Sequence, residues 1–83
     1  MDFIKRQENE KKFSNWEELP DGSRLYWFVI EGRLGWKAKY LKKVDSKEST
    51  LFFWQEIYDK AGILVEVHEK YPIDKGHKKI EKQ

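Results

Sequence analysis

The stretch Leu51–Lys70, LFFWQEIYDKAGILVEVHEK, decides the fold because it reads as two β-strands joined by a turn. Side chains alternate between the two faces of a strand. The first half is rich in aromatic residues, and the second half alternates polar residues with Val65 and Val67, a composition that suits a half-buried sheet. Between them, Asp59 and Gly62 supply the chemistry of a short hairpin loop. The sequence therefore predicts a central β-hairpin.

Two further strands are predicted before this hairpin. Arg24–Glu31 is apolar on both faces, which is typical of a strand covered on both sides, whereas Trp36–Val44 alternates apolar with basic residues. Residues 20–23 and 45–49 read as turns, and Pro72 ends the last strand because proline cannot donate a ladder hydrogen bond. Short connections favour neighbours in sequence, so we predict a four-stranded antiparallel meander.

The two ends of the chain have different compositions from the sheet. Residues 1–12 are charged and rich in helix formers, which predicts a short helix or a frayed arm. Ser14–Glu18 carries a capping pattern and predicts one helical turn. The lysine-rich residues 75–83 are expected to be a mobile basic tail. The chain 1–83 is thus predicted to be one mostly β (α+β) domain with its sheet core in residues 24–71.

A four-stranded sheet that is apolar on both sides needs a cover for its second face. The N-terminal segment packed across it, a strongly curled half-barrel or a homodimer would each provide that cover. Contiguous exposed apolar surface usually marks an interface. Self-association is therefore expected, and a protein-interaction module, such as a small inhibitor or an antitoxin-like partner, is one functional class that the sequence leaves open.

The composition excludes several classes of protein. The 83 residues contain no cysteine, which rules out disulfides and thiolate metal sites and makes the cytoplasm the default location. No apolar run approaches the ~20 residues of a membrane helix, so no membrane partner is expected. Two histidines are too few for a zinc site made by histidines alone. We expect no metal and no cofactor.

Charge is unevenly distributed although the net charge is only +2. Residues 33–43 contain basic side chains and no acid. Lysines on one strand face can follow a phosphate backbone, and exposed rings can stack on bases. We therefore predict an interface for nucleic acid, RNA or DNA, made by Arg33, Trp36, Lys37, Lys39, Tyr40, Lys42 and Lys43. In the alternative interpretation, the lysines are solvated residues that protect a strand edge from aggregation.

An enzymatic alternative depends on the histidines. The chain has no phosphate-binding loop, nucleophile elbow or paired-cysteine motif. Metal-independent RNA cleavage needs only a base, an acid and cations. The residues to suspect are Glu66, His68, Lys70 and His77. Such residues on a small antiparallel sheet are similar in outline to the ribonuclease toxins of the RelE-like class, and this resemblance implies RNA cleavage in a toxin–antitoxin pair. We favour non-catalytic binding over this alternative.

Overall fold

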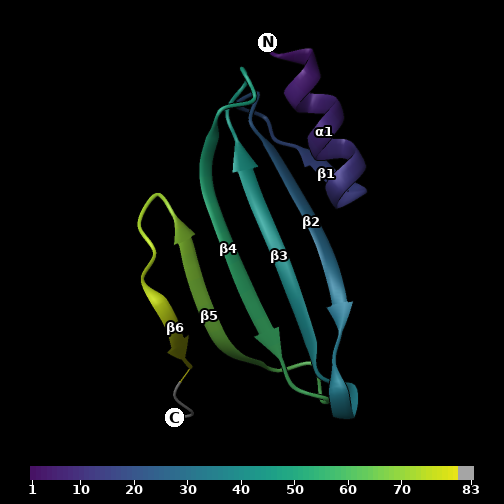
Figure 1. The fold of residues 1–83 in the computed structure, drawn as a ribbon, viewed down its shortest axis with the longest axis vertical. Helices are drawn as coiled ribbons and strands as arrows, with labels where there is room; N and C mark the ends of the chain where they lie inside the picture. The colour runs from purple at the N-terminus through teal and green to yellow at the C-terminus, as the bar shows by residue number, and fades with distance from the viewer. Residues whose placement is uncertain (81–83) are drawn as a thin grey trace.

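The chain forms one antiparallel sheet with a helix packed on one end of it (Figure 1). The computed structural model describes residues 1–80. Its elements are α1 (Phe3–Phe13), β1 (Asn15–Glu18), β2 (Arg24–Glu31), the 3-10 turn η1 (Arg33–Gly35), β3 (Lys37–Val44), β4 (Thr50–Tyr58), β5 (Leu64–Tyr71) and β6 (Gly76–Lys79). The strands lie side by side in chain order, and all neighbours are antiparallel. The predicted mostly β meander with a short N-terminal helix is confirmed, but the strand number is wrong: the sheet has six strands, not four.

The first additional strand, β1, replaces the helical turn predicted at residues 14–18. Ser14 ends α1 in the left-handed conformation, with φ 69°, and its N–H donates to the Glu10 carbonyl. The chain then pairs with the start of β2, where the Asn15 side chain also donates to the Trp27 carbonyl at 3.2 Å. Pairing with β2 therefore overrides the local capping pattern.

The second additional strand, β6, occupies part of the predicted mobile tail. Gly76–Lys79 pairs with Glu66–Glu69 of β5. The reversal between these strands is held by Asp74, whose carboxylate accepts the Gly76 N–H at 2.9 Å, and by the Lys75 N–H, which donates to the Glu69 carbonyl. The expectation of a mobile segment is thus wrong for residues 76–79, while residues 81–83 lie outside the described part of the chain.

The core lies between α1 and the upper end of the sheet. Phe13, the last residue of α1, is buried against Tyr26 of β2 and Val44 of β3. Its ring centroid lies 5.3 Å from that of Phe28 and 6.4 Å from that of Phe53. One aromatic residue at the helix end therefore anchors the helix to three strands.

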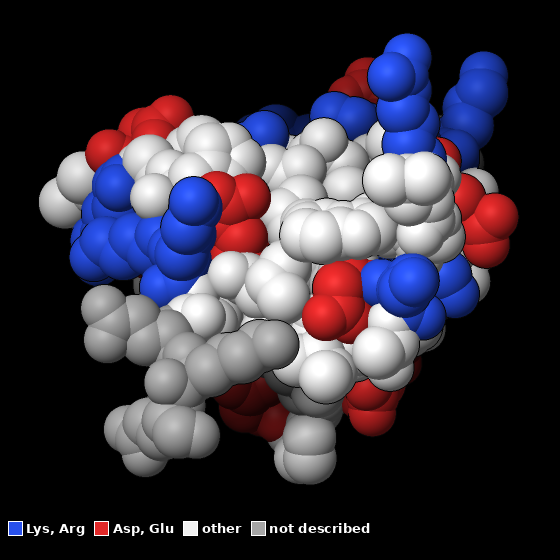
Figure 2. Space-filling model, turned by 90° about the horizontal axis from the view of Figure 1, so that it is seen from below, with Lys and Arg blue, Asp and Glu red and all other residues white. Residues whose placement is uncertain are grey.

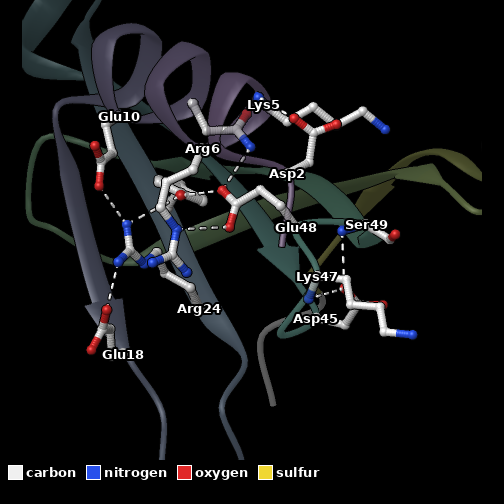
Figure 3. A network of polar contacts seen from close by, with 12 residues as sticks. Asp2, Lys5, Arg6, Glu10, Glu18, Arg24, Asp45, Lys47, Glu48 and Ser49 are labelled. Carbon is white, nitrogen blue, oxygen red and sulfur yellow. Dashed lines mark hydrogen bonds and ion pairs between the residues drawn. The ribbon is translucent and has the colours of Figure 1, made fainter.

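A network of polar side chains surrounds this core (Figure 3). Glu48, in the turn between β3 and β4, is only 2% exposed and accepts hydrogen bonds from Arg6, Asn9 and Tyr26. Arg24 is also buried, and its guanidinium donates to the carboxylates of Glu10 and Glu18. These bonds join α1, β1, β2 and the β3–β4 turn. Charge-assisted bonds thus fix the helix position where apolar contact is limited.

The helix covers only part of one face of the sheet (Figure 1). We call this side the helix face. It includes Tyr26, Phe28 and Phe53, all of which pack around Phe13. No second layer covers the opposite face within residues 1–80, and no helix in this range is long and apolar enough to span a membrane. The N-terminal segment is therefore a partial cover for one face.

Candidate nucleic-acid interface

The strand register divides the predicted interface between the two faces. Across β2 and β3, Leu25 pairs with Lys43, Val29 with Lys39 and Glu31 with Lys37, while Tyr26 pairs with Lys42. Directly paired residues point to the same face of a sheet. Because Tyr26 lies on the helix face, Lys42 does too, and the other three lysines point to the opposite side. We call that opposite side the open face.

The open face also receives aromatic side chains from the strands beside β3. Trp27 of β2 and Trp54 of β4 are both paired with Leu41, and Phe52 is paired with Lys43. Leu41 is consequently only 5% exposed. The Lys39 ammonium lies 5.5 Å from the centroid of the Trp27 ring, within the range of a cation–π interaction. Lysines and aromatic rings therefore share this face, although they come from three strands rather than one.

A hollow of about 350 Å³ opens on this face. Its lining residues are Lys43, Phe52, Trp54, Val67 and Glu69. The rings provide an apolar surface, the ammonium group can meet a phosphate, and the carboxylate can accept a hydrogen bond from an exocyclic amino group of a base. The hollow therefore has the parts needed to hold a flat, polar-edged ring beside a phosphate.

Glu56 introduces a negative charge among these lysines. It pairs across the strands with Lys39, and its carboxylate accepts hydrogen bonds from the Trp54 indole at 3.1 Å and the Tyr58 hydroxyl at 2.7 Å. Burial and this carboxylate raise the pKa of Tyr58 to about 12. The charge of Glu56 is thus engaged locally. Cationic and anionic side chains are interspersed rather than separated, as the end view of the molecule also shows (Figure 2).

The other predicted interface residues lie elsewhere. Tyr40 is on the helix face, stacked on Phe28 with ring centroids 4.9 Å apart. Lys42 donates to the Asn9 side chain at 2.9 Å, and burial lowers the pKa of its ammonium group. Trp36 lines a small hollow at the far end of the sheet, and Arg33 lies in η1. Of the seven predicted interface residues, the structure therefore places Lys37, Lys39 and Lys43 on the open face. The other four, Arg33, Trp36, Tyr40 and Lys42, lie elsewhere.

Sequence reasoning missed the aromatic partners of the lysines. It assigned the rings within the basic strand, Trp36 and Tyr40, to the interface, although alternation places them opposite the lysines. The rings that do share the open face come from β2 and β4: Trp27, Phe52, Trp54 and Tyr58. Alternation within each strand was visible in the sequence, but which faces coincide depends on the register between strands.

The two histidines form a second cluster, on β5 and β6. His68 Nδ1 lies 3.1 Å from His77 Nε2. His68 Nε2 lies 2.6 Å from a carboxylate oxygen of Asp74, and His77 Nδ1 lies 3.4 Å from one of Glu66. The hydrogen bond with His68 lowers the pKa of Asp74. Three of the residues predicted for RNA cleavage therefore meet, and Asp74, which the sequence analysis did not single out, joins them.

All four ring nitrogens of this cluster have a polar neighbour. In the contact between the rings, one nitrogen donates a hydrogen bond and the other accepts it. Lys70 is not part of this histidine cluster, because its ammonium group lies 5.1 Å from the centroid of the Tyr40 ring.

Within residues 1–80, no group of three or more histidine, aspartate or glutamate side chains is arranged to hold a metal ion. Comparison with known proteins found no matching family, no matching curated protein and no matching solved structure. Functional inference for this chain therefore depends on the geometry of its own surfaces.

Proposed function

We propose that the protein binds single-stranded nucleic acid on its open face without cleaving it. The observation that carries this proposal is that Lys37, Lys39 and Lys43 share one uncovered sheet face with the rings of Trp27, Phe52 and Trp54. Lysines in line can neutralise phosphates, while rings beside them stack on bases. Few other ligands would use both groups at once.

A single strand suits this face better than a duplex. Bases in a duplex are stacked on one another, so their flat surfaces cannot reach Phe52 or Trp54. Along β3, Lys37 and Lys39 are about 7 Å apart, since each residue of a strand advances the chain by about 3.3 Å. Contacts of lysines with phosphates and of rings with base faces are the same for every base, so we expect weak sequence preference.

The experiment is a salt titration of binding to a fluorescent single-stranded oligonucleotide, with Lys37→Gln/Lys39→Gln as the test variant. Each phosphate contact contributes roughly 0.7 to the slope of log affinity against log salt. Loss of two contacts should flatten this slope by about one to one and a half units and weaken all sequences alike. Fluorescence anisotropy gives the affinity, and tryptophan quenching reports stacking.

Lys11→Gln/Lys47→Gln is the matched control, because it removes the same charge from two exposed lysines outside the open face. Its slope should stay close to that of the wild type. Undetectable binding at low salt, or an equal slope in both double variants, would contradict the proposal. The lysines would then be solvated residues beside an apolar face, and a protein-interaction module would be the better interpretation.

The histidine cluster supports a second candidate, metal-independent RNA cleavage. In this step one histidine would act as the base that accepts the proton of a 2′-hydroxyl, and the other would act as the acid that gives a proton to the leaving 5′-oxygen. Because all four ring nitrogens are engaged, β6 must move before substrate can enter. Cleavage that survives a chelator and falls about 10²–10⁴-fold in His68→Ala or His77→Ala would support this candidate. Absence of cleavage by the wild type would eliminate it.

A further inference from the structure

Half of β2 has a free edge. β1 pairs only with Arg24–Trp27, and the remaining residues of β2, Phe28–Glu31, pair only with β3. No other described strand lies along this side of them. The ribbon shows β2 extending well beyond β1 at this end of the sheet (Figure 1). A strand edge without a partner offers a row of main-chain donors and acceptors to another strand.

Three of the four residues of this free edge, Phe28, Val29 and Ile30, are apolar, and Glu31 at its end is charged. Val29 is 49% exposed and Ile30 is 50% exposed, and they lie on opposite faces. Proteins protect edges with lysine, proline or a bulge. The β2–β3 ladder is regular along its whole length. By contrast, β6 at the other edge of the sheet carries Lys78 and Lys79.

We propose that a second copy of this chain pairs with this edge, antiparallel and symmetric about Ile30. A two-fold axis perpendicular to the sheet puts the open faces of both copies on one side and their helix faces on the other. Each residue of the edge can therefore pair only with a residue that points to the same face. With Ile30 opposite Ile30 of the second copy, Val29 lies opposite Glu31 and Phe28 opposite Gly32. Gly32 is extended, with φ −101° and ψ −164°, and can therefore continue the strand.

The neighbouring registers fit less well. Centring the pair on Val29 would place Glu31 of the second copy opposite Trp27, where Asn15 of β1 already lies. Centring it on Glu31 would place two carboxylates opposite each other, which is unfavourable. In the Ile30 register, Glu31 of the second copy lies beside Val29, which in turn lies beside Lys39 of β3. The carboxylate of Glu31 and the ammonium group of Lys39 are therefore on either side of Val29 on the open face, and their opposite charges attract. Charge and the length of the free edge thus select one register.

The helix face adds apolar contact in this register. Beside Ile30 there is a hollow of about 190 Å³, lined also by Gly32, Trp36, Lys37, Ala38 and Ile57. The two-fold axis would bring both hollows together around the paired isoleucines. Figure 2 views the molecule from this end and shows uncharged atoms across the middle of the surface. The dimer proposal does not rest on nucleic-acid binding, although it shares Lys37, which lines this hollow, and Lys39 with the proposed binding face.

The test measures association by sedimentation velocity between about 1 μM and 1 mM, a range in which modest affinities are visible. The wild type should form dimers as its concentration rises. Ile30→Lys and Ile30→Glu each place like charges at the two-fold axis and should weaken the dimer roughly tenfold or more. A mixture of the two variants should restore dimers, because opposite charges then face each other.

Ile63→Lys is the control, since Ile63 is similarly exposed, at 51%, but lies between β4 and β5. It should dimerise like the wild type, and circular dichroism should show all variants folded. A monomeric wild type at the highest concentration would overturn the proposal, as would undiminished association of both Ile30 variants. A mixture that remains monomeric would overturn the Ile30 register.

Discussion

Glu48 is held in an unfavourable backbone conformation by the hydrogen bonds of its side chain. Its φ is 72°, in the left-handed region that non-glycine residues seldom adopt. Its carboxylate gathers donors from α1 and β2. The hydrogen bonds of the Glu48 side chain stabilise the fold by joining the helix to the sheet, whereas the backbone strain at the same residue destabilises it.

Replacement of Glu48 should separate these contributions. Glu48→Ala leaves buried donors without a partner and should lower the free energy of unfolding by about 2–4 kcal/mol. Glu48→Gly loses the same bonds but relieves the backbone strain, so it should be about 1 kcal/mol more stable than the alanine variant. Urea denaturation measures both, with the exposed Glu8→Ala as a control. Equal stability of the two Glu48 variants would contradict the strain argument.

Two tyrosines should make stability depend on alkaline pH. Burial, with Glu48 beside it, raises the pKa of Tyr26 to about 12, and burial with Glu56 does the same for Tyr58. The unfolded value is close to 10. Because folding favours the neutral form, the stabilisation is complete below pH 10 and is lost as the pH rises from about 10 to 12. Ultraviolet titration should show these late ionisations, and Tyr58→Phe should remove one of them.

At the scale of elements, side-chain contacts hold β6 on β5 more than its short main-chain ladder does. It is four residues long, and its contacts with β5 include the chain from Asp74 through His68 and His77 to Glu66. The lowered pKa of Asp74 means that its ionised form is favoured by folding. Its contribution is therefore present above its ordinary pKa of 3.8 and is lost as the pH falls through the lower folded value.

His77→Ala should consequently release β6 while the rest of the sheet stays intact. Amide exchange should become fast at residues 76–79 and remain slow in β3 and β4, because those two strands are paired on both sides. Lys78→Ala is the control, since Lys78 pairs with Val67 and points to the other face. Unchanged protection of β6 in His77→Ala would show that the main-chain ladder alone holds it.

At the scale of the whole molecule, the two proposed surfaces adjoin each other at Lys37 and Lys39. The nucleic-acid proposal uses the open face, and the dimer proposal uses the edge of β2. A two-fold axis perpendicular to the sheet would set two open faces side by side, so a longer strand could contact both copies and bind more tightly through the raised effective concentration. Ile30 lies on the helix face, and its replacement leaves Lys37 and Lys39 in place. The two proposals can therefore fail separately.

The sequence by itself determined the four long strands and the central hairpin. Alternation of side chains is a local property, and Asp59 with Gly62 is a local turn signal, so neither needs knowledge of the rest of the chain. The N-terminal helix was also foreseeable, from a run of helix formers free of glycine and proline. The odd-numbered spacing of Lys37, Lys39 and Lys43 implies one shared face, and in the structure that face is the open face.

Only the tertiary structure decided how these parts combine. β1 and β6 exist because distant strands supply their hydrogen bonds, which outweighs a capping pattern at Ser14 and a lysine-rich composition after residue 75. The register between strands made Trp27 a neighbour of the lysines, and it brought His68 to His77. Pairing between strands depends on contacts far apart in the chain, so the pattern within any one strand could not reveal it.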